Sequence, residues 1–361
     1  DGTESGTTLV KQINSSTFSL TKHLFSYGDK LYFSSNDETS GGELWISDGT
    51  EDGTKLLKDI SSGSSSSNPQ YFTQRGSYIY FSVGNSSSMD GALWRTDGTE
   101  SGTTLVKDFG NGSTAPRGVY TNNQFLKFKN NLYFSLDDGV HGYELWKSDG
   151  TESGTTLVKD INSGTGDSSP GGFTIFGDHL YFAAEDEEYG RELWRTDGTE
   201  SGTTLVKDIN AGSDGSNLDS FTVSQNTLFL SAKDTSNGWA LWKTDGTESG
   251  TELVKDINPS DSSERIYKPR SPIDYGDKLV FFANDGETGL EVWKSDGTSE
   301  GTVLVKDLNS GSSNGISSEL YEESVLVHYE TKEILLFQGD NGSTGMELFS
   351  LDLVYPSISG P

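Results

Sequence analysis

The sequence contains no cysteine and few positive charges. Without cysteine there can be no disulfide framework, thiol nucleophile or cysteine-ligated zinc site. The 26 Lys and Arg residues are outnumbered by 55 Asp and Glu residues, which gives a formal net charge of −29. Because such a charge repels phosphate groups, we expect no nucleic-acid partner. No apolar run approaches the roughly 18 residues of a membrane-spanning helix, so we expect no membrane insertion.

A repeat runs through the whole sequence. The tripeptide Asp-Gly-Thr occurs seven times, starting at residues 1, 48, 97, 149, 197, 245 and 296. Six of these copies follow a Leu-Trp or Val-Trp pair, and successive tryptophans of the repeat are 48 to 52 residues apart. A constant period of this length indicates a repeat architecture such as a solenoid or a propeller.

Each period contains four short strand signals separated by turn residues. In the fourth unit these signals are residues 172–176, 180–184, 192–196 and 204–209. Gly177-Asp178 and Asp197-Gly198 are typical hairpin turns between antiparallel strands. A four-stranded unit of about 50 residues that repeats radially is a propeller blade. The sequence therefore predicts an all-β, seven-bladed β-propeller with four antiparallel strands per blade.

The ends of the sequence predict how the ring is closed. The chain opens with a fourth-strand sequence, residues 8–13, and its last copy stops at a third strand, residues 346–349. We expect the N-terminal strand to complete the last blade, because closure limits exposed sheet edges. The expected blades are about 18–60, 70–109, 123–161, 172–209, 220–257, 271–308 and 324–352 plus 1–13, with 353–361 as a tail or linker. Because the chain begins within a repeat, we expect it to belong to a longer protein.

The repeated motif resembles that of a known family. Residues 144–151 and 192–199 both read Glu-Leu-Trp, two further residues, and Asp-Gly-Thr. They resemble the ELWxxDGT repeat of large bacterial surface and secreted proteins, and the resemblance covers essentially the whole chain. It implies a propeller in a secreted, extracellular or cell-surface setting, and it implies no established activity. The last copy departs from the motif, since Phe349 replaces the tryptophan.

The positions just before each Glu-Leu-Trp or Ala-Leu-Trp unit differ from blade to blade. They include Tyr143, Arg191 and Trp239, and the neighbouring loops contribute His141 and Tyr189. Aromatic and polar groups side by side suit the binding of a sugar or a peptide, since Trp, Tyr and Arg are enriched in binding hot spots. The alternative is ordinary variation at a loop edge, with Trp239 covering a neighbouring blade. The Asp-Gly-Thr segments, by contrast, have the composition of a tight hairpin.

Pairs of acidic residues six positions apart bracket the loop between the second and third strands. Carboxylates at both ends of a short loop could hold Ca²⁺, which takes six to eight oxygen ligands. The alternative is that the aspartate caps a turn and the glutamate is a solvated edge residue. Ca²⁺ is the one cofactor that this pattern makes possible. The pairs are Asp37 and Glu43, Asp138 and Glu144, Asp186 and Glu192, and Asp285 and Glu291.

No catalytic constellation is recognisable in the sequence. The four histidines lack metal-ligand spacing, and no nucleophile elbow, phosphate loop or dinucleotide fingerprint is present. We therefore predict a non-enzymatic extracellular binding module for a glycan or a protein or peptide, as a monomeric domain of a larger surface or adhesive protein. Two alternatives stay open. One is a secreted carbohydrate-active enzyme that uses acidic residues near the axial opening, and the other is a passive structural spacer.

Overall fold

The computed structural model describes residues 2–15, 21–84, 91–110, 125–259, 268–275, 278–316, 326–329 and 334–352. The predicted tail, 353–361, lies outside these ranges. Within them every regular element is a β-strand, and no helix is long and apolar enough to cross a membrane. The chain divides into two compact units. Unit 1 comprises Asp1–Gly171 and Gly198–Thr203, and unit 2 comprises Gly172–Asp197 and Thr204–Pro361.

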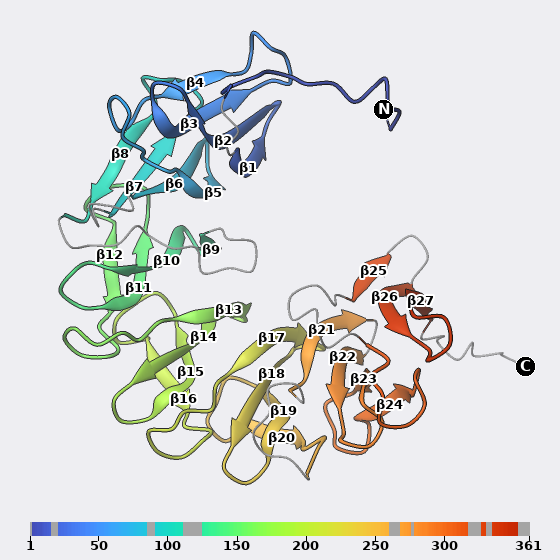
Figure 1. Ribbon diagram of the computed structural model, residues 1–361. Helices are drawn as coiled ribbons and strands as arrows, with labels where there is room; N and C mark the ends of the chain where they lie inside the picture. The colour runs from blue at the N-terminus through green and yellow to red at the C-terminus, as the bar shows by residue number, and fades with distance from the viewer. Residues whose placement is uncertain are drawn as a thin grey trace, which may run out of the picture. The chain divides into compact units, whose positions relative to one another are not determined.

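The first three sheets belong to unit 1, and in each of them four consecutive strands pair in chain order (Figure 1). The first sheet contains β1 (Lys22–Tyr27), β2 (Lys30–Asp37), β3 (Gly41–Ser47) and β4 (Lys55–Lys58). The second contains β5 (Gln70–Arg75), β6 (Tyr78–Gly84), β7 (Gly91–Thr96) and β8 (Thr104–Asp108). The third contains β9 (Leu126–Phe128), β10 (Asn131–Asp137), β11 (Tyr143–Ser148) and β12 (Thr156–Lys159).

The other four sheets follow the same order. The fourth contains β13 (Gly171–Phe176), β14 (His179–Asp186), β15 (Gly190–Thr196) and β16 (Thr204–Lys207). The fifth contains β17 (Asp219–Ser224), β18 (Thr227–Asp234), β19 (Gly238–Thr244) and β20 (Glu252–Lys255). The sixth contains β21 (Arg270–Tyr275), β22 (Lys278–Asn284), β23 (Leu290–Ser295) and β24 (Val303–Lys306). The seventh contains β25 (Val327–Tyr329), β26 (Ile334–Asp340) and β27 (Met346–Leu351).

The predicted fold class is confirmed, since the chain is an all-β protein of antiparallel propeller blades. The strand pairs in the seven sheets are antiparallel, and the second and third strands align the repeat in register, with Phe182 opposite Trp194 and Leu230 opposite Trp242. The core lies between consecutive sheets. In unit 2, for example, Tyr181 of the fourth sheet shares a buried cluster with Leu230 and Trp242 of the fifth. Apolar area buried in this way is the main stabilising contribution to such a fold.

The predicted closing strand is not formed among the described residues. Residues 8–13 are assigned to no strand, and β27 lies at the edge of a three-stranded sheet. Yet Lys11 Nζ donates to the carbonyl oxygen of Thr54 at 2.7 Å, just as Lys107 Nζ donates to that of Thr155 at 2.9 Å. The segment thus contacts the first sheet as the fourth strand of a preceding blade would. It does not pair with β27 among the described residues, so the two form no β-ladder. Closure of the ring stays a prediction.

Candidate functional site

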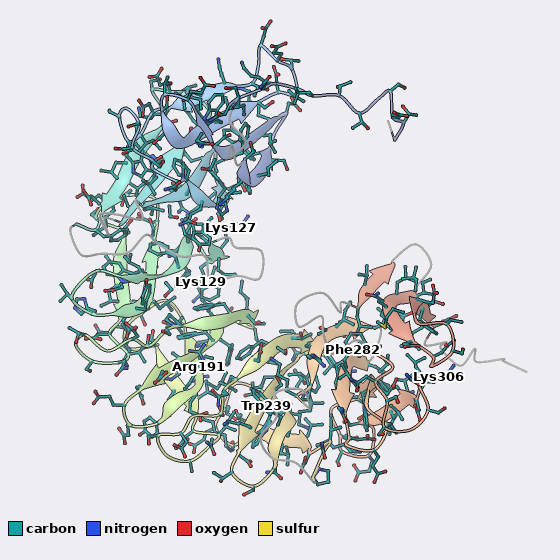
Figure 2. All side chains as sticks on the ribbon, in the orientation of Figure 1. Lys127, Lys129, Arg191, Trp239, Phe282 and Lys306 are labelled. Carbon is teal, nitrogen blue, oxygen red and sulfur yellow. The ribbon has the colours of Figure 1, made fainter. Side chains whose placement is uncertain are left out.

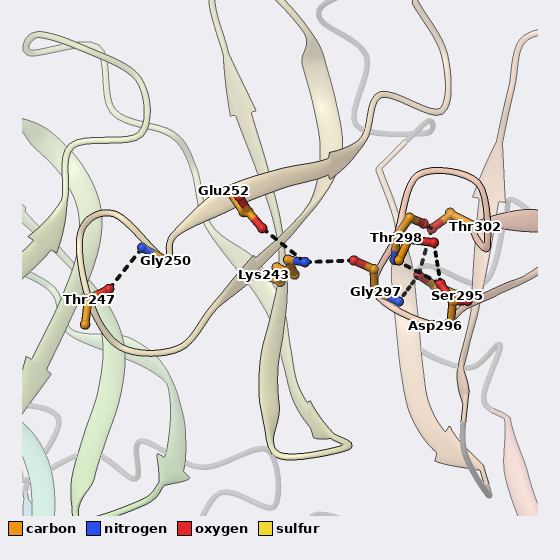
Figure 3. Close-up of polar contacts among 9 residues, drawn as sticks. All are labelled: Lys243, Thr247, Gly250, Glu252, Ser295, Asp296, Gly297, Thr298 and Thr302. Carbon is orange, nitrogen blue, oxygen red and sulfur yellow. Dashed lines mark hydrogen bonds and ion pairs between the residues drawn. The ribbon is translucent and has the colours of Figure 1, made fainter.

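The hairpin between the third and fourth strands satisfies its polar groups internally (Figure 3). In the sixth sheet the hydroxyls of Ser295 and Thr302 are 2.7 Å apart, and Ser295 Oγ accepts a hydrogen bond from the N–H of Gly297 at 3.0 Å. Asp296 Oδ1 accepts from the N–H of Thr298 at 2.9 Å. A Cβ atom at Gly301 would lie 2.0 Å from that carboxylate. The repeated Asp, Gly and Thr residues are therefore required by the turn itself.

Basic side chains join each hairpin to the preceding sheet. Lys243 of β19 donates to the carbonyl oxygen of Gly297 at 2.9 Å (Figure 3), and Lys255 of β20 donates to that of Thr302 at 2.7 Å. In unit 1 Lys147 makes the equivalent bond to Gly198 at 2.7 Å. These bonds to charged donors hold consecutive sheets together.

The glutamate of the repeated motif is buried and accepts hydrogen bonds from the connection to the next sheet. Glu192 is 0% exposed. Its Oε2 atom accepts from the N–H of Ile209 at 2.9 Å and from Ser216 Oγ at 2.7 Å, and its Oε1 atom accepts from the N–H of Asn210 at 3.2 Å. We call this set of bonds the glutamate contact. Three other sheets have it: Glu43 with Ile60 and Ser67, Glu144 with Ile161, Asn162 and Ser168, and Glu291 with Leu308 and Gly315.

Burial changes the protonation of these glutamates. It raises the pKa of Glu144, Glu192 and Glu291 to about 7, although the hydrogen bonds that they accept act in the opposite direction. The pKa of Glu43 is raised for the same reason. A carboxyl group without solvent contact loses hydration when it ionises, which favours the neutral form.

These contacts contradict the expected solvated position of the bracket glutamates, and calcium binding by the brackets stays a prediction. Glu43, Glu144, Glu192 and Glu291 are not solvated edge residues, since each is 0% exposed and bonded to its own chain. Their aspartate partners form turns: Asp186 Oδ1 accepts from the N–H of Tyr189 at 2.7 Å, and Asp37 and Asp285 accept from backbone N–H groups in the same way. Across the described ranges, no group of three or more His, Asp and Glu side chains could hold a metal ion. The predicted turn-capping role of the aspartates is the one that the geometry supports.

The predicted ligand anchor, Trp239, is buried and not exposed as expected. Its side chain is only 5% exposed, so it is not a free surface for stacking. Lys268 Nζ lies 5.7 Å from the centre of its ring, and Arg191 and Trp239 are labelled in Figure 2 on β15 and β19. The expectation of an exposed indole is wrong, because the residue is covered from within unit 2.

The other predicted ligand residues are partly buried. Tyr189 and Arg191 belong to unit 2, and His141 and Tyr143 belong to unit 1. His141 Nδ1 lies 2.8 Å from Asp138 Oδ2, and this contact raises the pKa of the histidine. Burial lowers the pKa of Arg191, against the opposing effect of Glu185 and Asp219. Ligand binding by these residues stays untested.

Irregular backbone recurs at the start of the first strands, which the sequence analysis did not single out. In four sheets the pairing with the second strand shifts register there. The second residue of each bulge has a left-handed backbone although it is not glycine: φ is 55° at His23, 57° at Tyr71, 56° at Ser220 and 51° at Ser271. Such a conformation costs about 1–3 kcal/mol per residue. We call Lys22 with His23, Gln70 with Tyr71, Asp219 with Ser220, and Arg270 with Ser271 the bulge pairs.

The bulge pairs share a backbone conformation but not a side-chain chemistry. In unit 2 Asp219 forms an ion pair with Lys268, and its Oδ1 atom accepts from the N–H of Ser220 at 2.7 Å. In unit 1 Lys22 and His23 are exposed. These positions could have been identified in the sequence, because they stand at a fixed number of residues before each second strand and differ in charge from sheet to sheet.

Comparison with known proteins gives a likeness in structure only. No family model and no curated protein sequence matches the chain. Prolyl oligopeptidase B from Galerina marginata is 10% identical with a TM-score of 0.47, and the alignment covers 94% of this chain and 50% of that one. A puromycin-hydrolyzing peptidase from Mycobacterium tuberculosis is 9% identical with a TM-score of 0.42, covering 92% and 51%. The β-propeller domain of the Trilobed protease from Pyrococcus furiosus is 12% identical with a TM-score of 0.38, covering 94% and 97%.

The function expected from the sequence is corrected at this point. The chain spans about half the length of the peptidases and hydrolases named first among these structures. The proposed anchor of the ligand, Trp239, is buried. The prediction of a non-enzymatic binding module of an adhesive protein, with Trp239 as the anchor of its ligand, is therefore withdrawn.

Proposed function

We propose that this chain is the accessory propeller domain of a larger enzyme that acts on polypeptide, and that the first strands guide the polypeptide. The observation that carries the proposal is that both units contain bulge pairs, where a costly backbone conformation recurs beneath different side chains. A strained backbone that recurs with different side chains suits a recognition surface. The backbone conformation is the same in each sheet, while the side chains can differ to suit the ligand.

The ligand class follows from the position of these strands. β1, β5, β17 and β21 each lie at the edge of their sheet, so one side of each strand is outside the ladder. An exposed strand edge binds extended polypeptide through main-chain hydrogen bonds, and β1, most of whose residues are exposed, is the most accessible of the four. The charges at the bulge pairs range from Lys22 to Asp219, which would select among side chains of the polypeptide. An enzyme that acts on polypeptide, such as a peptidase, is the catalytic partner that suits this surface.

The test is binding of a fluorescein-labelled peptide of alternating threonine and lysine, followed by fluorescence anisotropy. The variant is Lys22→Glu at a bulge pair, and the matched control is Lys30→Glu, which is exposed at the opposite end of the first hairpin. We expect Lys22→Glu to tighten binding roughly threefold, as for other exposed charge pairs, and Lys30→Glu to leave it unchanged. Failure of the unaltered chain to bind this peptide, or an equal response of the two variants, would overturn the proposal.

A further inference from the structure

The first strands of the three sheets in unit 1 lie next to one another (Figure 1). Phe25 of β1 stacks on Phe72 of β5, with 6.3 Å between the ring centres. The N–H of Phe125, just before β9, donates to Thr73 Oγ1 of β5 at 2.8 Å. The strands β1, β5 and β9 are therefore neighbours in sequence order, and we call them the inner strands of unit 1.

The inner strands of unit 1 differ in charge from the rest of the chain. Acidic residues outnumber basic ones by 55 to 26 in the sequence, yet none of these three strands contains an aspartate or a glutamate. Their basic residues are Lys22 and His23 on β1, Arg75 on β5, and Lys127 on β9, with Lys129 directly after it. A surface with basic groups and no carboxylate is an exception in a chain of formal net charge −29.

Two of these cations are available to a ligand. Lys22 and Lys127 are exposed, and neither ammonium group forms a hydrogen bond or an ion pair with any residue that the structure describes. Side chains alternate along a strand. Because Leu126 and Phe128 are only 7% and 4% exposed, Lys127 between them is directed away from the core (Figure 2).

The other basic groups of the inner strands are engaged within unit 1 or neutral. Arg75 Nη2 donates to a backbone carbonyl oxygen at 2.6 Å. Lys129 Nζ lies 5.1 Å from the centre of a phenylalanine ring. Burial, and then the charge of Lys22, lower the pKa of His23, so this imidazole is neutral at pH 7. The free positive charge of this surface is therefore that of Lys22 and Lys127.

The first strands of unit 2 provide the contrast. There Lys268 forms an ion pair with Asp219 at the start of β17. Arg270, at the start of β21, is only 7% exposed. Asp274 of β21 accepts a hydrogen bond from Ser224 Oγ at 2.6 Å. The cations beside β17 and β21 are thus paired or covered, whereas those of β1 and β9 are not.

We propose that the inner strands of unit 1 select acidic segments of the polypeptide, with Lys22 and Lys127 each pairing with a carboxylate of the ligand. The inference rests on the proposed function, because it assumes that polypeptide lies along the first strands, and it adds the charge that this polypeptide carries. Main-chain hydrogen bonds to a strand edge are the same for every sequence. Complementary side-chain charges supply the specificity.

An extended segment is long enough to reach both lysines. Stacked sheets lie about 10 Å apart, so β1 and β9, two sheets apart, are separated by about 20 Å. An extended chain advances about 3.3 Å per residue, so eight residues span roughly 26 Å. Alternate side chains of such a segment point to the same side. A peptide of this length with a carboxylate at every second position can therefore place one beside each lysine.

The net charge of the whole chain does not prevent this selection in physiological salt. At about 0.15 M ionic strength the Debye length is about 8 Å, so distant carboxylates are screened from a bound peptide. The charges that act on the peptide are then those of the strands that it contacts. One exposed charge pair changes affinity by up to about fivefold.

The test compares three fluorescein-labelled peptides of eight residues, in which threonine alternates with glutamate, glutamine or lysine. Fluorescence anisotropy at about 0.15 M salt gives the affinities. We expect the unaltered chain to bind the glutamate peptide most tightly and the lysine peptide least tightly. Each step should be about threefold, as for exposed charge pairs.

Charge reversal identifies the residues that select. Lys22→Glu and Lys127→Glu should each weaken binding of the glutamate peptide about threefold, and the double variant about tenfold, since distant sites act additively. Each should tighten binding of the lysine peptide. The matched control is Lys55→Glu, at an exposed lysine of β4, the outermost strand of the first sheet, and it should alter neither affinity.

Lysine acetylation, followed by mass spectrometry, locates the ligand on the unaltered chain. Saturating glutamate peptide should slow the reaction of Lys22 and Lys127 and leave that of Lys55 unchanged. The selection is overturned if the glutamate peptide binds no more tightly than the other two, or if it leaves Lys22 and Lys127 as reactive as before. The proposed function survives either result, because peptide is still bound. Failure of all three peptides to bind would overturn the proposed function, and the selection with it.

Discussion

Each sheet has two contrasting edges. One carries the hairpin between the third and fourth strands, and the other carries the first residues of the first strand. In the hairpins the side chains repeat: the hydroxyls of Thr244 and Thr251, like those of Ser295 and Thr302, are 2.7 Å apart. At the first strands the backbone repeats while the side chains change. Contacts to the next sheet require particular donors and acceptors in the side chains. Binding of an extended ligand at the first strand, as proposed, requires only that the backbone have the right shape. A repeat can therefore conserve side chains at one edge and backbone shape at the other.

Removal of the N-terminal segment, which contacts the third-to-fourth-strand hairpin of the first sheet, should have the largest effect. Deletion of residues 2–13 removes the bond from Lys11 to Thr54 and the segment predicted to complete the last blade. We expect the melting temperature to fall by more than about 2 °C, since more than one kcal/mol of contacts is lost. Lys11→Met, which keeps the segment, should produce a smaller fall in the same calorimetric scan. Equal melting of the deleted and full-length chains would reject the closing strand.

Loss of one buried hydroxyl should weaken a hairpin without removing it. Thr244→Val deletes the group that bonds Thr251 Oγ1 and accepts from the N–H of Gly246 at 2.9 Å. A buried donor without a partner costs about 1–3 kcal/mol, so the free energy of unfolding should fall by that amount. Urea denaturation measures it. Thr247→Val, on the exposed turn, should cost less, and the reverse order would contradict this account.

A change of pH should alter the stability of the fold through the buried glutamates, which bond the segment between each fourth strand and the next first strand. The pKa of Glu144, Glu192 and Glu291 is about 7 in the folded chain against 4.5 for a free side chain. The folded state thus binds these protons more tightly than the unfolded state, and its stability is greatest below about pH 4.5 from this cause. It should decline as the pH rises through 7. Urea titrations at pH 6 and pH 8 should show the decline, and the Glu144→Gln and Glu192→Gln double variant should reduce it.

The smallest expected effect is a gain of stability at the first strand. Ser220 has a φ of 56°, which glycine adopts without steric cost. Ser220→Gly should therefore stabilise the fold by up to about 1 kcal/mol, whereas Ser220→Ala should not. If glycine at this position destabilises the chain in urea, the strain attributed to the bulge pair is not present.

The sequence allowed the blades to be predicted because their signals are local. Alternating apolar residues and Asp-Gly turns lie within each period, so β14 to β16 fall within two residues of their expected ranges. The candidate site was less predictable. Trp239 looked like an exposed anchor because its position varies, and only the tertiary structure places Lys268 over it. Glu192 was expected to be a calcium ligand or a solvated residue, since the donors that bury it come from residues 209–216, well away in the sequence.

The positions of the tryptophans have a spectroscopic consequence. Trp146, Trp242 and Trp293 are 7%, 6% and 6% exposed, and each shares a buried cluster with residues of the preceding sheet. Their indole rings therefore report on the junction between sheets more than on the interior of one sheet. Intrinsic fluorescence should be blue-shifted in the folded chain. It should move to longer wavelength as soon as neighbouring sheets separate, even while the hairpins within each sheet persist.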